Sequence, residues 1–151
     1  MPSPRNPATQ KTSKMLKLSH IAIATPRIEE VARKLKALAM EVETTHAVPT
    51  EKVTAAMIPV GVSEHFRVEL LEPTAGDSPI AKFLEKKPSG GLHHICFEVQ
   101  GLEKWHSVLV KEGFEVLAPG IRKAARGRAL FIHPKSFSGV LVELEEITSH
   151  H

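Results

Sequence analysis

The stretches LKLSHIAIA (16–24) and GLHHICFEV (91–99) decide how this chain folds. Both alternate apolar or β-branched residues with small or polar ones, which is typical of a half-buried strand. They also match each other, because LSHI (18–21) recurs 74 positions later as LHHI (92–95). The same kind of strand therefore begins two segments of the chain.

The same offset of 74 continues well beyond these strands. The tripeptide VEL occurs at 68–70 and again at 142–144. Two copies of a unit this long do not make a solenoid, so the pattern indicates a duplicated half-domain. Further pairs at this offset are mostly apolar: Leu35 with Leu109, Val42 with Val116, Ala55 with Ala129, Met57 with Phe131 and Ile58 with Ile132, beside Glu29 with Glu103.

Two histidines and two glutamates occupy equivalent places in the repeat. His20 precedes Glu69 by 49 positions, and His94 precedes Glu143 by 49 as well. Each glutamate must point away from its apolar neighbours, because alternate strand residues share a face. A carboxylate inside a fold is costly unless a cation or a donor compensates it. The four side chains suit one divalent ion with two positions left open, so we expect a metal enzyme.

The predicted elements follow the same order in both halves, which indicates an α+β protein. Each half opens with a strand followed by a helix, and two more strands complete it. A segment with a short helix near 80–86 connects the halves, and one further weak strand is expected near Val42 or Val116. The predicted strands are 16–24, 53–60 and 66–71, then 92–99, 129–133 and 140–146, and the predicted helices are 28–38 and 102–112.

The length of 151 residues, with 42% hydrophobic and 25% charged residues, predicts one compact domain of two halves. Residues 1–16 are polar and we interpret them as a disordered leader; a mitochondrial targeting segment is the alternative, although Pro2, Pro4 and Pro7 oppose the amphipathic helix it would need. The expected boundaries are a leader at 1–16, a single domain at 17–147 and a tail at 148–151. Within the domain we expect module one at 17–73, a connector at 74–90 and module two at 91–147.

Composition argues against several classes of function. The net charge of +3 is mild and the basic residues are dispersed, so no nucleic-acid partner is expected. No apolar run is long enough to cross a bilayer, so no membrane partner is expected either. The single Cys96 cannot form an internal disulfide, which favours a reducing compartment: the cytoplasm, or the mitochondrial matrix in a eukaryote.

Three neighbouring residues have simpler interpretations than catalysis. His93 must point to the opposite side of its strand from His94, so packing or support of a ligand is expected. Cys96 lies in apolar company and is expected to be a buried small residue rather than a nucleophile. Trp105 lies at helical spacing with apolar residues and is expected in the core.

Several motifs together resemble the methylmalonyl-CoA epimerase family of the vicinal oxygen chelate superfamily, over about residues 17–147. The resemblance implies paired β-α-β-β-β modules that form one curved mixed sheet around a metal site, and a homodimer. Residue by residue, it assigns the ligand role to His20, Glu69, His94 and Glu143. The motifs are LSHIAI (18–23), VELLEP (68–73), DSPIA (77–81), GGLHHICFEV (90–99), HPK (133–135) and GVLVEL (139–144).

The resemblance implies an enzyme that interconverts (2R)- and (2S)-methylmalonyl-CoA by removing and returning the C2 proton. The enolate would be stabilised by one divalent metal ion per chain, with Co²⁺ as the first candidate and Mn²⁺, Ni²⁺ or Zn²⁺ as the others. Inversion needs proton exchange on both faces of C2. The resemblance gives one of these roles to Glu143. The second acid of the family aligns with Thr54, a poor base, so nearby Glu51 is the candidate, with a solvated loop acid as the alternative.

Four basic residues are candidates for the phosphates of coenzyme A by charge alone: Lys123, Arg126, Arg128 and Lys135. Three other functions stay open for the same fold. A glyoxalase-like lyase would use a similar metal set, and an extradiol dioxygenase would use two histidines and one glutamate around iron. A metal-free binding module would not need all four ligands.

Overall fold

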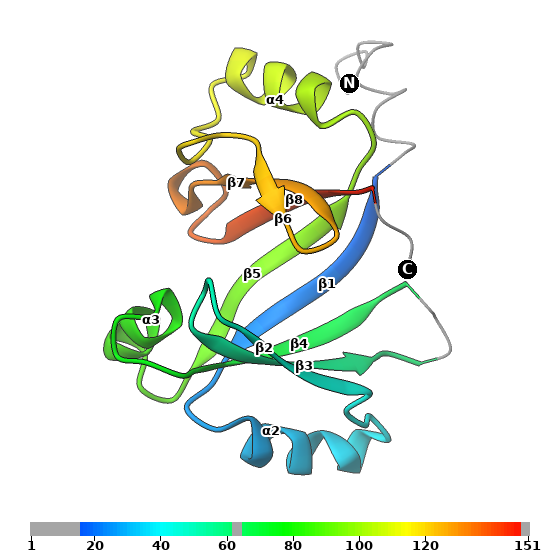
Figure 1. The fold of residues 1–151 in the computed structure, drawn as a ribbon, viewed down its shortest axis with the longest axis vertical. Coiled ribbons are helices and arrows are strands. Elements are labelled where there is room, and N and C mark those ends of the chain that lie inside the picture. The colour runs from blue at the N-terminus through cyan, green and yellow to red at the C-terminus, as the bar shows by residue number, and fades with distance from the viewer. Residues whose placement is uncertain (1–15, 62–64, 149–151) are drawn as a thin grey trace, which may run out of the picture. The chain divides into compact units, whose positions relative to one another are not determined.

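A computed structural model describes residues 16–61 and 65–148 of the chain. These residues belong to two compact units (Figure 1). One is Ser19–Ile95, and the other contains the described residues among Met1–Leu18 and Cys96–His151. Nearly all of the leader expected at 1–16, and most of the tail expected at 148–151, lie outside the described residues. The boundaries expected for the two modules stay a prediction.

The first unit, Ser19–Ile95, has the strand order β2-β3-β4-β1-β5. β1 runs parallel to β4, whereas β3 is antiparallel to both of its neighbours, so the sheet is mixed. The elements, in chain order, are β1 (Lys17–Ala24), α2 (Ile28–Leu35) with a 3-10 turn at Lys36–Leu38, β2 (Thr44–Val48), β3 (Val53–Pro59), β4 (Arg67–Pro73), α3 (Pro79–Lys86) and β5 (Gly91–Glu98).

The two faces of this sheet are covered by different helices. On one face, the buried residues Ala56, Ile58, Val68 and Leu70 pack against α2. On the other face, a second buried cluster packs against Ile80 of α3. This second cluster contains Ala22, Ala24, Val53, Ala55 and Leu71 from the strands. Strand alternation therefore separates the residues of each strand into an α2 face and an opposite face.

In the second unit, the strands β8, β7 and β6 neighbour one another in that order. Its elements are α4 (Leu102–Lys111), β6 (Arg122–Ala124), β7 (Gly127–Ile132), a 3-10 turn at Pro134–Ser136 and β8 (Leu141–Ile147). Seven buried apolar residues form its core: Val99, Leu102, Leu109, Leu130, Ile132, Val142 and Leu144.

All the strands and helices predicted from the repeat are present within a few residues of the predicted ends. The weak strand expected near Val42 in the first half is β2, two residues further on. In the second half, Val116 makes only an isolated bridge to Ile132, and the edge strand is β6. Cys96 is fully buried and Trp105 packs against the core of the second unit, which confirms the structural interpretation of both residues.

The described part of the chain contains no helix with the length and apolar character that a membrane crossing requires.

Candidate metal centre

Three of the predicted ligands come together in the unit Ser19–Ile95. Val68 and Leu70 are buried on the α2 face, so Glu69 between them points to the opposite face. His20 of β1 and His94 of β5 meet it there. The two Nε2 atoms are 3.3 Å apart, and an oxygen of Glu69 lies 3.9 Å from each of them.

This donor set fits a divalent cation. Both histidine side chains are only 8% exposed and that of Glu69 is 17% exposed, so water screens the group poorly. Nitrogen and oxygen donors bonded at about 2.1 Å to one ion lie roughly 3 to 3.4 Å apart. In the triangle of the three donor atoms, one side of 3.3 Å lies within this range and the two sides of 3.9 Å are slightly longer, which leaves space at the centre for an ion. Borderline metals such as Co²⁺ and Zn²⁺ favour such a mixture of imidazole and carboxylate.

The remaining nitrogen of each imidazole is held by a neighbouring side chain. The Nδ1 atom of His20 lies 3.0 Å from the Ser19 hydroxyl, and the Nδ1 atom of His94 lies 2.9 Å from Nδ1 of His93. The His93 ring in turn packs edge-on against Phe83 of α3. Such partners fix the ring orientation and leave Nε2 available to a metal. His93 thus contacts a ligand candidate and packs against α3, and its support of a metal ligand stays a prediction.

Gly90, shortly before the two histidines, occupies a position that requires glycine. Its φ of +88° lies in the region that favours glycine. A Cβ at this position would collide with the carbonyl oxygen of Ala24. The start of β5 can therefore approach the end of β1 closely, which helps to set His94 beside His20.

Glu143, the fourth predicted ligand, lies in the other unit. On β8 it is flanked by Val142 and Leu144, which are buried in that unit's core, and it pairs in register with Phe131 of β7. The alternation around Glu143 thus reproduces that around Glu69. Its roles as ligand and proton carrier stay predictions.

The two positions considered for the second proton carrier have different surroundings. Glu51 lies in the turn between β2 and β3 with an exposed side chain, and its carbonyl oxygen accepts a hydrogen bond from the Ser78 hydroxyl at 3.1 Å. Thr54 pairs in register with Glu72, whose carboxylate accepts a hydrogen bond from the backbone N–H of Ile28 at the start of α2. Thr54 therefore lies on the α2 face, away from the three donors. The role of Glu51 stays a prediction.

Three of the four basic candidates for coenzyme A binding make ion pairs within their own unit. Arg128 contacts both Glu103 and Glu146, the latter at 2.5 Å. Its hydrogen bonds lower the pKa of Glu103 to about 2 and also lower that of Glu146. The other pairs are Arg126 with Glu145 at 3.4 Å and Lys135 with Glu115 at 2.8 Å. Lys123 is exposed on β6.

Sequence reasoning missed two acids that begin the helices. Glu72 accepts a hydrogen bond from the backbone N–H of Ile28 at 2.9 Å, and Glu146 accepts one from that of Leu102 at 3.0 Å. Each carboxylate thus satisfies a free N–H at the positive end of a helix dipole. The two glutamates are 74 positions apart, so the repeat itself carried the signal.

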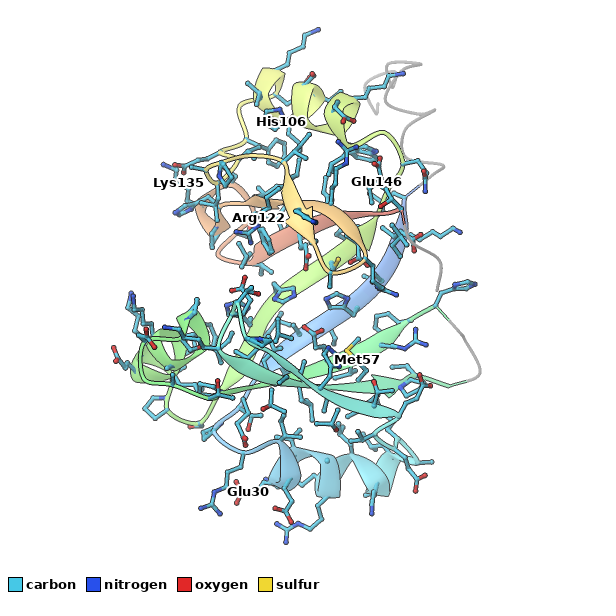
Figure 2. The ribbon with its side chains drawn as sticks, viewed as in Figure 1. Glu30, Met57, His106, Arg122, Lys135 and Glu146 are labelled. Atoms are coloured by element: carbon cyan, nitrogen blue, oxygen red, sulfur yellow. The ribbon has the colours of Figure 1, made fainter. Side chains whose placement is uncertain are left out.

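It also missed two residues on the edge strands. His46 of β2 pairs in register with Ala55, and Arg122 of β6 pairs with Ala129 (Arg122 is labelled in Figure 2). Ala55 and Ala129 are equivalent in the repeat, but the chain between them and the edge strands differs in length. Only the observed register makes His46 and Arg122 counterparts.

Comparisons with known proteins agree with this architecture. Residues 19–131 match the Glyoxalase/Bleomycin resistance protein/Dioxygenase superfamily. The ethylmalonyl-CoA/methylmalonyl-CoA epimerase of Cereibacter sphaeroides is 42% identical over 134 residues, which cover 87% of this chain and 98% of that protein.

Two solved structures are similar over most of the chain. The methylmalonyl-CoA epimerase of Streptomyces coelicolor in complex with 2-nitronate-propionyl-CoA is 29% identical, with a TM-score of 0.78 over 89% of this chain and 99% of that one. A methylmalonyl-CoA epimerase in complex with methylmalonyl-CoA and NH4+ is 29% identical, with a TM-score of 0.77 over 89% and 96%.

These similarities confirm the α+β class and the paired β-α-β-β-β modules expected from the sequence. They also confirm the resemblance stated on the motifs. The chain belongs to the methylmalonyl-CoA epimerase family, a family of isomerases within the Glyoxalase/Bleomycin resistance protein/Dioxygenase superfamily.

Proposed function

We propose that this protein is an epimerase that interconverts (2R)- and (2S)-methylmalonyl-CoA. The observation that carries the proposal is the convergence of His20, Glu69 and His94 in a chain 42% identical to an epimerase of this name. A relative with 29% identity has been solved with methylmalonyl-CoA bound. The substrate would thus be a coenzyme A thioester that carries a carboxylate.

His20, Glu69, His94 and Glu143 would hold one divalent ion, with Co²⁺ as the first choice and Mn²⁺, Ni²⁺ or Zn²⁺ as alternatives. When bound, such an ion supplies positive charge that stabilises the oxyanion formed as the C2 proton leaves. The Glu69 carboxylate lies 3.9 Å from each imidazole and is only 17% exposed, which supports this assignment, because a poorly solvated carboxylate gains most from a cation.

The remaining chemistry belongs to side chains of the protein. Glu143 would carry a proton to or from one face of C2. Ser19 and His93 would keep the two imidazoles in one tautomer and orientation, since each contacts an Nδ1 atom. The low exposure of the three donors would limit access of water, which strengthens every charge interaction there.

For the coenzyme A phosphates we propose Lys123 ahead of the other three candidates. Arg126, Arg128 and Lys135 would each have to leave an acidic partner first, whereas Lys123 is exposed and has no ion pair among the described residues. We also propose a homodimer and a cytoplasmic location, or the mitochondrial matrix in a eukaryotic cell.

The function is tested with a single epimer of methylmalonyl-CoA in deuterated water. We expect the protein loaded with Co²⁺ or Mn²⁺ to produce the other epimer and to incorporate deuterium at C2, with loss of both after chelation. Ethylmalonyl-CoA is the natural second substrate, because the relative from Cereibacter sphaeroides carries both names. Failure to exchange the C2 proton of either thioester would contradict the proposal.

The three rival functions predict other outcomes in the same preparation. A glyoxalase-like lyase would turn over a glutathione hemithioacetal, and a dioxygenase would cleave a catechol with iron and oxygen. A metal-free binding module would show neither stoichiometric metal after purification without chelator nor any gain on adding Co²⁺ or Mn²⁺.

A further inference from the structure

The pairing register of β2, β3, β4 and β1 defines which residues share a face with the metal-ligand candidates. Residues paired across neighbouring strands lie on the same face. Met57, labelled in Figure 2, pairs with Glu69, and Glu69 pairs with Ala22. We name this surface the triad face, after the three ligand candidates His20, Glu69 and His94. Its residues on β1 to β4 are His20, Ala22, Ala24, Thr44, His46, Val48, Val53, Ala55, Met57, Pro59, Arg67, Glu69, Leu71 and Pro73.

Apart from the three ligand candidates, only two of these described strand residues carry a group that can be charged. Arg67 lies 3.6 Å from Glu43, and a guanidinium group only donates hydrogen bonds, so it does not suit acceptance of the C2 proton. His46 is the other. An imidazole accepts and donates a proton near neutral pH, which is what the second step of an inversion requires.

The position of His46 suits a contact with substrate rather than with the metal. Two strand spacings and two residues separate it from Glu69, so in a flat sheet the two Cα atoms are about 12 Å apart. That distance is too long for a direct hydrogen bond and leaves room for a small acyl group between the side chains. The residue opposite His46 is Ala55, whose single methyl group does not block the ring on the triad face. His46 is also exposed.

We propose that His46 is the second proton-transfer residue, a catalytic group that exchanges the C2 proton on the face not served by Glu143. In one direction the C2–H bond breaks, its proton moves to the imidazole of His46, and its electron pair enters the thioester carbonyl as an enolate. Glu143, protonated beforehand by solvent, then donates its proton to the other face of C2. The reverse reaction uses the same groups in opposite order. This assignment rests on the proposed epimerase function.

Two variants distinguish His46 from Glu51, the candidate for the second proton carrier expected from the sequence. His46→Gln replaces the imidazole with an amide and changes the size of the side chain little, and Glu51→Gln replaces the carboxylate with an amide. Thr45→Gln is the matched control, because it places the same side chain on the opposite face of the same strand. Bound metal per chain and the melting temperature of each variant establish that the fold is kept.

The experiment measures epimerisation and C2 deuterium incorporation separately for each pure epimer of methylmalonyl-CoA. For His46→Gln we expect epimerisation to fall by about 10²- to 10⁴-fold. One epimer should still exchange its C2 proton at a rate near that of the parent, while exchange of the other is lost. Thr45→Gln should behave like the parent, and the loss of exchange in one epimer only should be found in His46→Gln and not in Glu51→Gln.

Equal loss of exchange in both epimers would overturn the assignment, because that indicates a structural effect. Unchanged epimerisation by His46→Gln would overturn it too, as would one-sided loss in Glu51→Gln instead. A parent protein that exchanges neither epimer would contradict the epimerase function itself, and so is distinguishable from a failure of His46 alone.

Discussion

The half built on β1–β4 and the half built on β5–β8 make the same main-chain contacts at positions 74 apart. In each half, the strand that carries the glutamate ligand candidate accepts a backbone hydrogen bond from the residue after the first strand. The turn after the helix is closed by an equivalent backbone hydrogen bond in both halves. The shared hydrogen bonds are Thr25 N–H to Leu71 O and Val99 N–H to Glu145 O, Met40 N–H to Leu35 O and Phe114 N–H to Leu109 O, and Glu43 N–H to Met57 O and Leu117 N–H to Phe131 O.

The halves differ in the side chains at equivalent places. Ser19 contacts Nδ1 of the histidine that follows it in one half, whereas His93 does so in the other. On the edge strands, the residue opposite the repeated alanine is His46 in one half and Arg122 in the other. The two halves thus share the positions that form these backbone contacts and carry the ligand candidates, whereas flanking positions carry different side chains.

The largest expected effect concerns Glu69 and Glu143, which occupy equivalent positions but have different proposed roles. Glu143→Gln should lower C2 deuterium exchange by at least about 10³-fold, because an amide cannot carry the proton. Glu69→Gln should retain bound metal and measurable exchange, since an amide oxygen can still act as a ligand. Exchange by Glu143→Gln at the parent rate would show that the carboxylate is not the proton carrier.

A smaller effect compares the two side chains that support the histidines. Ser19→Ala and His93→Phe each remove the partner of an Nδ1 atom and should weaken metal binding by about 10- to 100-fold. Titration of the apoprotein with Co²⁺ measures this. Ser107→Ala, at an exposed hydroxyl of α4, is the control. Parent affinity in both variants would mean that neither partner orients a ligand.

Arg122 is the edge-strand residue opposite the repeated alanine in the second half. Its guanidinium carbon lies 4.2 Å from the centre of the Phe131 ring, and it has no acidic partner among the described residues. A permanent cation held this way suits a carboxylate or a phosphate. We expect Arg122→Ala to raise the KM for methylmalonyl-CoA about 10-fold with a smaller change in kcat, and Arg122→Lys to recover part of it. An unchanged KM in Arg122→Ala would exclude this contact.

The helix-starting glutamates should contribute modestly to stability. Glu72→Gln and Glu146→Gln each weaken a hydrogen bond to a helix N-terminus, and we expect each to lower the free energy of unfolding by about 1 kcal/mol. Glu146→Gln should have the larger effect, because Glu146 also contacts Arg128. Urea unfolding measures both, and a larger loss in Glu72→Gln would contradict the ranking.

The smallest expected effect concerns acid. Arg128 lowers the pKa of Glu103 to about 2 from an ordinary value of 4.5, so this pair stabilises the folded state fully above about pH 4.5 and loses that contribution as the pH falls toward 2. Arg128→Met should lower Tm by about 2 to 4 °C at pH 7. The difference from the parent should shrink below pH 4, and a difference that grows there would contradict this account.

Most of the fold was predictable because the sequence pattern of each element occurs twice in the repeat. Glu69 and Glu143 each lie between two buried apolar residues of the same strand, so the alternation of apolar and polar residues is clear in the sequence. The edge strands are different. All but one residue of β2 are exposed, so the sequence of β2 has no alternation that would reveal its register. His46 therefore could not be assigned to the triad face before the pairing with Ala55 was known.

The site was predictable to a similar degree and for a related reason. His20, Glu69 and His94 lie on strands with buried residues, and the alternation of those strands predicts which face of the sheet each side chain occupies. The capping role of Glu72 depends on the position of the first turn of α2 relative to β4. The ion pairs of Arg126, Arg128 and Lys135 with acids depend on side-chain contacts. Charge alone could not distinguish these from groups free to bind a phosphate.

Anomalous diffraction from crystals grown with Co²⁺ tests most directly whether two residues from each half hold one cation. We predict a single strong peak per chain, within bonding distance of Nε2 of His20, Nε2 of His94 and the carboxylates of Glu69 and Glu143. A peak that lacks either carboxylate, or the absence of any peak at this position in crystals of active protein, would contradict the account.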